Sequence, residues 1–337
     1  MDNSAEPPAG GYHPIIRGTG SYLPARILTN DDLMQIVDTS DEWITTRTGI
    51  KTRHVASDAD TTATLSTEAA RRALEAAHVA PDQVDLVMIG TVTPEMVFPS
   101  TACFVQAALN MTNAWAFDLA AACSGFIYGL CIAQQFIQTG RYKNILVIGA
   151  ETLTKITNYK DRASCILFGD GAGAVLVQRG TGPTRGVMYG NCSADGHGWT
   201  SLNCLAYGSR YPVGKPLDDP DMVYMNIKGR EVYQLAVRRI VEMVEDCLEK
   251  CRLTIDDITL FIPHQMNARI IESVGKRLSI PHERIYINID HVGNTSAASI
   301  PIALDECVRQ GRLKRGDIAL LVAFGGGLTW GANVIEF

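Results

Sequence analysis

Cys123 stands where a thiol could act as a nucleophile. In AFDLAAACSGFIYGL (116–130) it follows a strand-like stretch that ends near Ala120 and precedes a helical pattern. It would therefore lie at a helix N-terminus, whose free N–H groups and dipole favour an anion. Such a setting can lower the pKa of a thiol and produce a nucleophilic thiolate. A free cysteine among small residues is otherwise a buried packing residue, and the local sequence leaves both interpretations open.

Two further polar residues occupy comparable positions. His264 directly follows the apolar run ITLFIP, at the carboxyl end of a predicted strand, where open α/β sheets usually build their ligand sites. Asn294 follows Gly293, which permits a tight turn, and precedes another helical pattern. An asparagine in that place could equally be a helix cap. Neither residue is decisive alone.

Composition limits the classes of protein. The chain has 337 residues, a formal net charge of −6, and no run of about 18 apolar residues that could span a membrane. The acidic balance argues against general nucleic-acid binding. The N-terminus MDNSAEPPAGGYHP lacks the basic end and apolar core of a signal peptide, and residues 1–13 are predicted to be a disordered tail. The nine cysteines show no zinc-like spacing and indicate reduced thiols in a cytoplasmic protein without a metal site.

Strand-like and helix-like segments alternate along the chain. Uniformly apolar strands are typical of sheets that are covered on both faces, so the alternation predicts a layered α/β fold. The predicted strands are 84–90, 145–150, 174–178, 258–263, 285–289 and 318–324. The predicted helices are 62–77, 125–140, 231–250 and 300–311.

The sequence also contains an internal repeat. Segment 74–90 resembles 248–264 at a separation of 174 residues, and TGRYK (139–143) resembles QGRLK (310–314) at a separation of 171. Two pairs in the same order predict a duplicated fold with halves at 14–180 and 181–337. The separation of 171 pairs Cys123 with Asn294, and that of 174 pairs Gly90 with His264. The duplication therefore predicts that the three polar side chains converge.

Two glycine-rich runs have different predicted roles. GDGAGA (169–174) leads straight into a strand and not into a helix, so it is not expected to bind a dinucleotide. FGGGLTWG (324–331) follows a predicted strand and suggests a turn whose backbone N–H groups could hold an oxyanion.

Seven motifs, in order, resemble those of the β-ketoacyl-acyl carrier protein synthases III, which are condensing enzymes of the thiolase superfamily. The resemblance covers nearly the whole chain after the tail and implies a thiolase-like, internally duplicated α/β/α/β/α five-layer fold. The motifs are GTGSYLP (18–24), DEWITTRTGI (41–50), AAACSGF (120–126), FGDGAGA (168–174), PHQMNARI (263–270), GNTSAAS (293–299) and FGGGLTWG (324–331).

The resemblance implies a role for several residues. Cys123 matches the acyl-accepting nucleophile, His264 and Asn294 match its catalytic partners, and Gly326 matches the glycine whose N–H joins that of Cys123 in an oxyanion hole. The remaining matches are Trp43, Arg47 and Arg162 for the coenzyme A nucleotide, Asn267 for its pantetheine arm, and Phe98 for the acyl pocket of the partner subunit in a homodimer.

The activity implied is the decarboxylative condensation of an acyl-CoA primer, expected to be acetyl-CoA, with malonyl-acyl carrier protein, without a metal or redox cofactor. A basic stripe fits an acidic carrier protein. Arg269, Lys276 and Arg277 share one face of the helix after His264, and Gln265 is assigned to the same surface. A solvated helix face is the other interpretation of this stripe.

Some residues depart from the family pattern, and other functions stay open. Arg230, Tyr233 and Met266 differ beside the expected substrate channel, and His291 and Val292 precede the GNTS motif. A second hypothesis is a starter enzyme of secondary metabolism that uses another acyl donor for a polyketide or alkylquinolone. A third is a catalytically silent acyl-binding subunit, against which the intact Cys, His and Asn argue.

Overall fold

Two mixed β-sheets form the centre of the molecule. The computed structural model describes residues 11–337, apart from the side chain of Arg230. The first sheet has the order β1-β7-β6-β4-β5, in which β4 is parallel to both β5 and β6. The second has the order β11-β12-β13-β8, in which β11 and β12 are parallel. The strands are β1 (His13–Tyr22), β4 (Leu86–Gly90), β5 (Trp115–Leu119), β6 (Asn144–Thr152), β7 (Asp170–Gly180), β8 (Gly186–Ala194), β11 (Leu260–Pro263), β12 (Ile318–Gly325) and β13 (Thr329–Glu336).

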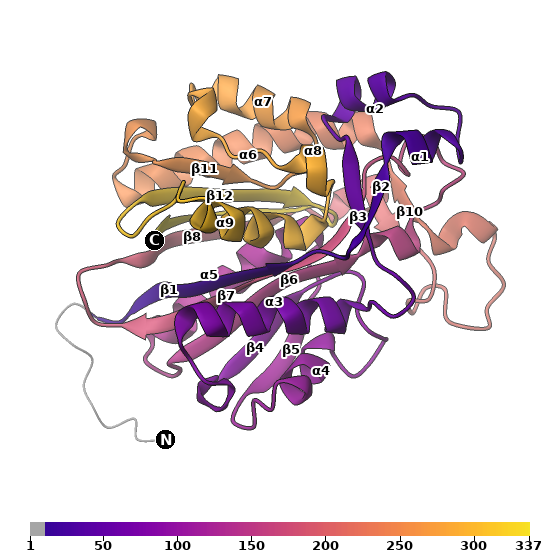
Figure 1. Cartoon of the computed structure of the whole chain (residues 1–337). Helices are drawn as coiled ribbons and strands as arrows, with labels where there is room; N and C mark the ends of the chain where they lie inside the picture. The colour runs from indigo at the N-terminus through magenta and orange to yellow at the C-terminus, as the bar shows by residue number, and fades with distance from the viewer. Residues whose placement is uncertain (1–10) are drawn as a thin grey trace.

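Helices cover both faces of each sheet. Helices α5 (Gly125–Gln138) and α9 (Ser299–Arg309) lie between the sheets and share one apolar core with both of them. The outer face of the first sheet packs against α3 (Thr62–Ala77) and α4 (Thr101–Ala108). The outer face of the second packs against α6 (Gly229–Cys251) and α7 (Ala268–Arg277). Figure 1 shows the resulting α/β/α/β/α order, which confirms the predicted five layers.

Strand β6 illustrates why the sheets are buried. All nine of its residues are buried. Ile145 and Val147 enter the core shared with α5 and α9, whereas Leu146 and Ile148 enter the core under α3. Alternate side chains of a strand point to opposite faces, so a strand covered on both sides must be apolar throughout.

The two halves repeat at a separation of 174 residues, and this corrects one pairing. The short 3₁₀ turn Ala122–Ser124 before α5 has its counterpart in Ser296–Ala298 before α9. The residue equivalent to Cys123 is therefore Ala297, and the predicted pairing with Asn294 is wrong. The separation of 171 arises later, because α9 has 11 residues and α5 has 14. The pairing of Gly90 with His264 holds, since β4 begins at Leu86 and β11 begins 174 residues later, at Leu260.

Segment 285–289 is not the strand that its apolar residues predict. Only Ile285 forms a bridge, to Phe261, and the short helix α8 (Ile289–Val292) begins at the end of the segment. The Gln265 side chain accepts hydrogen bonds from the N–H groups of Asn288 and Ile289 and donates one to the carbonyl of Tyr286. A side chain thus takes the backbone groups that a neighbouring strand would have paired.

The predicted disordered tail extends too far toward the C-terminus. Residues 1–10 of the predicted 1–13 tail lie outside the described residues. His13 already pairs with Gly180 in the first sheet, and the Arg179 guanidinium lies 4.7 Å from the centre of the Tyr12 ring. The chain passes from β7 to β8 between Gly180 and Gly186, beside the predicted boundary of the two halves.

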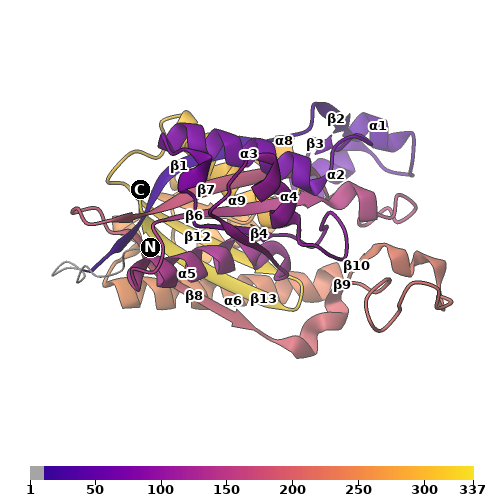
Figure 2. The ribbon, with the colours of Figure 1, turned by 90° about the horizontal axis from the view of Figure 1, so that it is seen from below.

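Two excursions from the layers lie at one end of the molecule. The first contains β2 (Arg26–Thr29), α1 (Asn30–Met34), α2 (Asp41–Thr48) and β3 (Thr52–Val55). The second contains β9 (Leu202–Cys204) and β10 (Met225–Ile227). Figures 1 and 2 place both at the same end, where they border the site described next. Among the helices of residues 11–337, none is long and apolar enough to cross a membrane.

Candidate active site

A strained turn between β5 and α5 carries Cys123. The preceding residue, Ala122, has a φ of 44°, which residues with a Cβ rarely adopt. Two hydrogen bonds tie this turn to β13: the Thr329 hydroxyl donates to the carbonyl of Ala121 at 2.9 Å, and the Ser124 hydroxyl donates to the carbonyl of Thr329 at 3.1 Å. The thiol is therefore held by contacts from the other half of the chain.

Cys123, His264 and Asn294 all line one cavity of about 450 Å³. The structure thus brings together three residues that are far apart in sequence, as predicted. Apolar side chains from both halves form most of the remaining wall, including Val92, Leu153, Ile156, Phe168, Leu202, Met225, Ile227, Val232 and Phe324. Such a wall suits an acyl chain, because it offers apolar surface and few competing hydrogen bonds.

The His264 imidazole is buried without a polar partner. Its side chain is 1% exposed, and neither ring nitrogen forms a hydrogen bond within residues 11–337. Burial lowers the pKa of His264 to about 3, so the ring is neutral at physiological pH. A neutral imidazole keeps one N–H donor. His264 is therefore suited to donate a hydrogen bond to a ligand in the cavity.

Backbone contacts fix Asn294 in the wall of the cavity. Its N–H donates to the carbonyl of Leu167 at 2.9 Å, and its carbonyl accepts from Gly169 at 3.0 Å. A Cβ on Gly169 would lie 2.5 Å from the carbonyl oxygen of Val292, so only glycine permits this approach. The Asn294 side-chain oxygen accepts from the N–H of Ser296 at 2.9 Å, which directs the amide NH₂ away from the turn.

The two glycine-rich runs have structural roles around these residues. GDGAGA leads into a strand and not into a helix, as predicted, but β7 already begins at Asp170, inside the glycine-rich run. In FGGG, a Cβ on Gly325 would lie 2.7 Å from the Cys123 nitrogen. The end of β12 can therefore come this close to Cys123 only because residue 325 is a glycine. Gly326, the residue predicted for an oxyanion hole, lines the same cavity.

The Cys123 thiol does not have the lowered pKa that its helix N-terminus predicted. Burial raises the pKa of Cys123 to about 11, hydrogen bonding with the Ser296 side chain lowers it, and the nearby Glu151 carboxylate raises it further. Desolvation of the thiolate therefore outweighs the favourable helix end. Cys123 is a thiol at neutral pH and has to lose a proton before it can act as a nucleophile.

A second cavity of about 630 Å³ connects this site with the surface. Trp43 stands there between two arginines: the guanidinium carbons of Arg47 and Arg162 lie 4.6 and 4.4 Å from the centre of its ring. Asn267 and Tyr233 line both cavities, so the cavity of Trp43 adjoins that of Cys123. The predicted coenzyme A residues thus surround a basic and aromatic entrance.

The basic stripe lies beside this entrance, with one correction. Arg269, Lys276 and Arg277 are exposed on α7, and Arg269 lines the entrance cavity. Lys276 and Arg277 line a neighbouring hollow of about 540 Å³, which Tyr233 also borders. Gln265, however, is 1% exposed and uses its side chain to hold segment 286–289. The assignment of Gln265 to a carrier-protein surface is therefore wrong.

Phe98 lies on the exposed loop between β4 and α4. Its side chain is 81% exposed and that of Val97 85% exposed. Phe98 is absent from the described lining of the cavity that contains Cys123. If it contacts an acyl pocket, that pocket belongs to another copy of the chain.

Sequence reasoning missed two polar residues near the thiol. Glu151 is fully buried near the end of β6, and Ser296 donates a hydrogen bond to its carboxylate at 3.1 Å. A charged residue directly after the apolar run ILVIGA was the available signal for Glu151. Ser296 lies in the quoted GNTSAAS motif but had no predicted role. Of the departures from the family pattern, Tyr233 and Met266 line the cavity, and the Arg230 side chain lies outside the described part.

The fold and the site define a class of protein: a duplicated five-layer α/β protein in which a partly buried cysteine, a buried histidine and a buried asparagine line one largely apolar cavity. The family description "3-Oxoacyl-[acyl-carrier-protein (ACP)] synthase III" matches residues 117–196, and its C-terminal counterpart matches residues 248–337. The chain belongs to the β-ketoacyl-acyl carrier protein synthase III family, a family of acyltransferases.

Individual relatives agree with this assignment. The chain is 54% identical to a β-ketoacyl-[acyl-carrier-protein] synthase III of Caldanaerobacter subterraneus, over 96% of this chain and 97% of the relative. A crystal structure of 3-oxoacyl-[acyl-carrier-protein] synthase III from Aquifex aeolicus has a TM-score of 0.90 and 46% identity, covering 97% of this chain and all of that one. The priming β-ketosynthase of the R1128 polyketide pathway has a TM-score of 0.90 but 34% identity, covering 99% of this chain and 98% of that one.

Proposed function

We propose that this enzyme condenses a short acyl-CoA primer, acetyl-CoA first, with malonyl-acyl carrier protein to give 3-oxoacyl-acyl carrier protein, the step that initiates fatty acid synthesis. The observation that carries the proposal is the cavity shared by Cys123, His264 and Asn294, which opens between Trp43 and two arginines. The 54% identity to the synthase III of Caldanaerobacter subterraneus, against 34% to the polyketide priming enzyme, favours this reaction over a starter enzyme of secondary metabolism.

In the first half-reaction, the Cys123 sulfur attacks the thioester carbonyl of the primer. A covalent acyl-enzyme forms and coenzyme A leaves. The backbone N–H groups of Cys123 and Gly326 are proposed to hold the oxyanion of the tetrahedral intermediate. The proximity of Gly325 and Gly326 to the Cys123 turn supports this role.

In the second half-reaction, the malonyl thioester loses carbon dioxide and becomes an enolate. The enolate oxygen requires fixed donors, and His264 and Asn294 supply them. The support is physical: the ring of His264 is neutral and has no protein partner in the described residues, and Asn294 directs its NH₂ group away from its own turn. The enolate carbon then attacks the acyl-cysteine, and the product leaves on the carrier protein. These steps use only the chain and its two thioester substrates, so the proposal includes no cofactor.

The residues around the entrance suit both substrates, the acyl-CoA primer and malonyl-acyl carrier protein. Trp43, Arg47 and Arg162 are proposed to hold the nucleotide of coenzyme A through stacking and charge, with Asn267 near the pantetheine arm. The exposed Arg269, Lys276 and Arg277 are proposed to contact an acidic carrier protein beside the same opening.

The proposal also includes a homodimer and a cytoplasmic location. Exposed apolar side chains cluster on the loop of Met96, Val97 and Phe98, and this loop is proposed to reach the acyl pocket of a second copy. All nine cysteines are free thiols, which supports a reducing compartment.

Mass spectrometry of the intact protein tests the proposed activity. After incubation with acetyl-CoA we expect an acetyl adduct on Cys123, which malonyl-acyl carrier protein then discharges. Cys204→Ala is a matched control, because Cys204 lines the same cavity and its loss should leave the adduct intact. Cys123→Ala should abolish it. A chain that forms no adduct with acyl-CoAs of any length would contradict the enzymatic proposal, and a marked preference for long or aromatic donors would favour the starter enzyme.

A further inference from the structure

Glu151 is a buried carboxyl group that has no role in the reaction steps proposed above. It is fully buried and accepts hydrogen bonds from the hydroxyls of Thr91 and Thr93 and from the N–H groups of Val92 and Thr93, at 2.6 to 3.2 Å. Within the described residues, no lysine, arginine or histidine forms an ion pair with it. Burial therefore raises the pKa of Glu151 to about 7, and hydrogen bonds from Thr93, Val92, Ser296 and Thr91 act in the opposite direction.

Ser296 lies between Glu151 and the nucleophile. Its hydroxyl donates to one carboxylate oxygen of Glu151 at 3.1 Å, and Ser296 lines the same cavity as Cys123, where hydrogen bonding to its side chain lowers the pKa of the thiol. Its φ of 49° lies in the left-handed region. Cys123 and Ser296 occupy the equivalent turns of the two halves, and these turns are in contact: a Cβ on Gly125 would lie 3.6 Å from that of Ala297.

Acyl transfer needs a place for the thiol proton. Cys123 is protonated at neutral pH, and the coenzyme A that leaves requires a proton in return. His264 is a poor acceptor, because burial keeps its ring neutral down to a pH of about 3. The groups that face Glu151 from β4, from the loop after it and from the Ser296 turn are hydroxyls and N–H groups, and Cys123 is the titratable neighbour. Glu151 is therefore the acidic group placed to exchange a proton with the thiol.

We propose that Ser296 and Glu151 form a proton relay for Cys123. The Cys123 S–H gives its proton to the Ser296 oxygen while Ser296 passes its own proton to the Glu151 carboxylate. The sulfur then forms a bond to the acyl carbon as the bond to the coenzyme A sulfur breaks. The proton returns from Glu151 through Ser296 to the departing thiolate, so Glu151 is unchanged at the end. After condensation Glu151 takes up one proton from the solvent, and Ser296 passes it on to the released Cys123 thiolate, which restores the thiol.

The relay deepens the proposed function and rests on it for the acyl step. Ser296 is the catalytic member, because it contacts the reacting sulfur, and Glu151 is a positioning residue that acts through it. A purely structural role for Glu151 would be to hold Val92 and Thr93 in the loop after β4. That role would affect folding but would not connect Glu151 to the ionisation of the thiol.

The test measures the rate at which iodoacetamide alkylates Cys123 as a function of pH, which needs no acyl substrate. For the wild-type protein we expect an inflection near pH 7, where Glu151 ionises, and a plateau above it. Glu151→Gln and Ser296→Ala should lose the inflection and react about tenfold or more slowly at pH 7.5. Ser296→Ala is the sharper variant, because it leaves the other hydrogen bonds of Glu151 in place. The folded state of each variant is checked by thermal unfolding.

Thr91→Val is the matched control. It removes one hydroxyl that donates to Glu151 but leaves the path through Ser296, so it should keep the inflection. An inflection near pH 7 that persists in Ser296→Ala would overturn the relay, as would a wild-type profile that rises steadily to above pH 10. Acetyl-CoA acylation of the wild-type protein is measured separately: absence of acylation together with the expected alkylation profile would count against the proposed function and not against the relay.

Discussion

At the scale of single residues, burial sets the protonation state of the site. It raises the pKa of Cys123 to about 11 and that of Glu151 to about 7, and lowers that of His264 to about 3. All three shifts favour the neutral form, because a low-dielectric interior penalises charge. The cavity thus starts the reaction nearly uncharged, and fixed donors can act strongly on the charge that develops there.

Asn294→Asp tests the donor proposed for the enolate. The carboxylate keeps an oxygen that can accept from the Ser296 N–H but removes the NH₂ donor. We expect condensation to fall by about 10²–10³, measured as release of carbon dioxide from malonyl-acyl carrier protein. Acetylation of Cys123 should persist, since it precedes the enolate. A variant that condenses at the normal rate would remove Asn294 from the mechanism.

The buried His264 should make the protein less stable in acid. Its folded pKa of about 3 lies below the usual 6.5. The folded state therefore binds fewer protons than the unfolded state, and stability falls as the pH drops below 6.5. Between pH 7.5 and 5 this contribution is about 2 kcal/mol. We expect urea unfolding to show that lowering the pH from 7.5 to 5 destabilises His264→Gln less than the wild type, by this amount. His197 is exposed, so His197→Gln should lose as much stability as the wild type.

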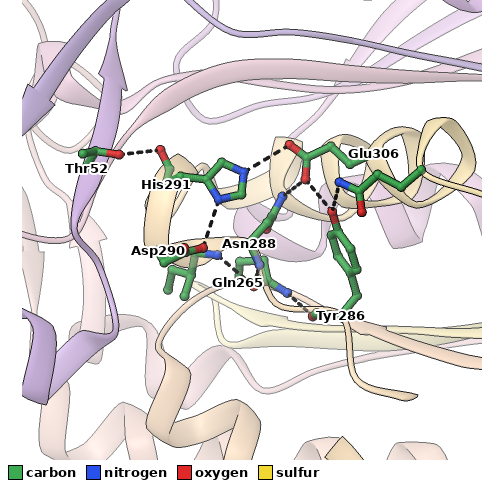
Figure 3. Close-up of polar contacts among 9 residues, drawn as sticks. Thr52, Gln265, Tyr286, Asn288, Asp290, His291 and Glu306 are labelled. Atoms are coloured by element: carbon green, nitrogen blue, oxygen red, sulfur yellow. Dashed lines mark hydrogen bonds and ion pairs between the residues drawn. The ribbon is translucent and has the colours of Figure 1, made fainter. Parts of the chain in front are cut away.

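At the scale of elements, a polar network connects α8 to α9 just before Asn294. Figure 3 shows His291 between two carboxylates: its ring nitrogens lie 2.9 Å from Asp290 and 3.5 Å from Glu306. Glu306 also accepts hydrogen bonds from Tyr286 and Asn288 at 2.9 and 2.7 Å. The network replaces the strand pairing that segment 285–289 lacks, and so holds the loop that positions Asn294.

His291 should stabilise the protein at neutral pH and lose this effect in base. Hydrogen bonding to Glu306 raises the pKa of His291 to about 9, burial opposes the shift, and Asp290 adds to it. A raised folded pKa gives stability that is fully present below pH 6.5 and is lost as the pH rises through 9. Since the side chain is 52% exposed, the effect should be about 1 kcal/mol or less.

The matched pair for this prediction is His291→Gln and Glu306→Gln. Both should lower the free energy of unfolding at pH 6.5, and both should differ less from the wild type at pH 10. The comparison uses chemical unfolding at the two pH values. Equal destabilisation of His291→Gln at both pH values would show that the charge of His291 does not contribute.

At the scale of the whole molecule, the site belongs to neither half alone. Cys123 comes from the first half and His264 and Asn294 from the second, and the two meet where the turns before α5 and α9 face each other in the middle layer. The net charge of −6 is distributed so that the entrance is locally basic, with Arg47, Arg162 and the residues of α7 around it. Local potential, more than net charge, steers a charged partner.

Reversing the charge of the basic stripe on α7 should lower the reactivity of the enzyme toward malonyl-acyl carrier protein. For Arg269→Glu combined with Lys276→Glu we expect kcat/KM for malonyl-acyl carrier protein to fall by about tenfold at low salt, with a smaller difference at 0.5 M salt. Acetylation of Cys123 by acetyl-CoA should change less. Lys314→Glu is the control, because Lys314 is exposed before β12, at the end of the second sheet remote from the site. Equal losses in all variants would argue against a docking surface on α7.

The amino-acid sequence by itself determined the layers, the duplication and most of the site. Apart from segment 285–289, each predicted strand and helix corresponds to an element of the structure, because periodicity and burial act over short segments. The motifs around Cys123, His264, Asn294 and Gly326 indicated which residues the cavity would contain. All of these are local signals, which a sequence carries residue by residue.

Only the tertiary structure decided how these residues are placed and charged. It showed that Ala297 is the counterpart of Cys123, that the Gln265 side chain replaces a strand pairing, and that Ser296 donates a hydrogen bond to the buried Glu151. It also showed that the pKa of Cys123 is raised and not lowered, since desolvation depends on every layer that covers the thiol. These properties arise from segments far apart in sequence, so no local pattern of residues could have revealed them.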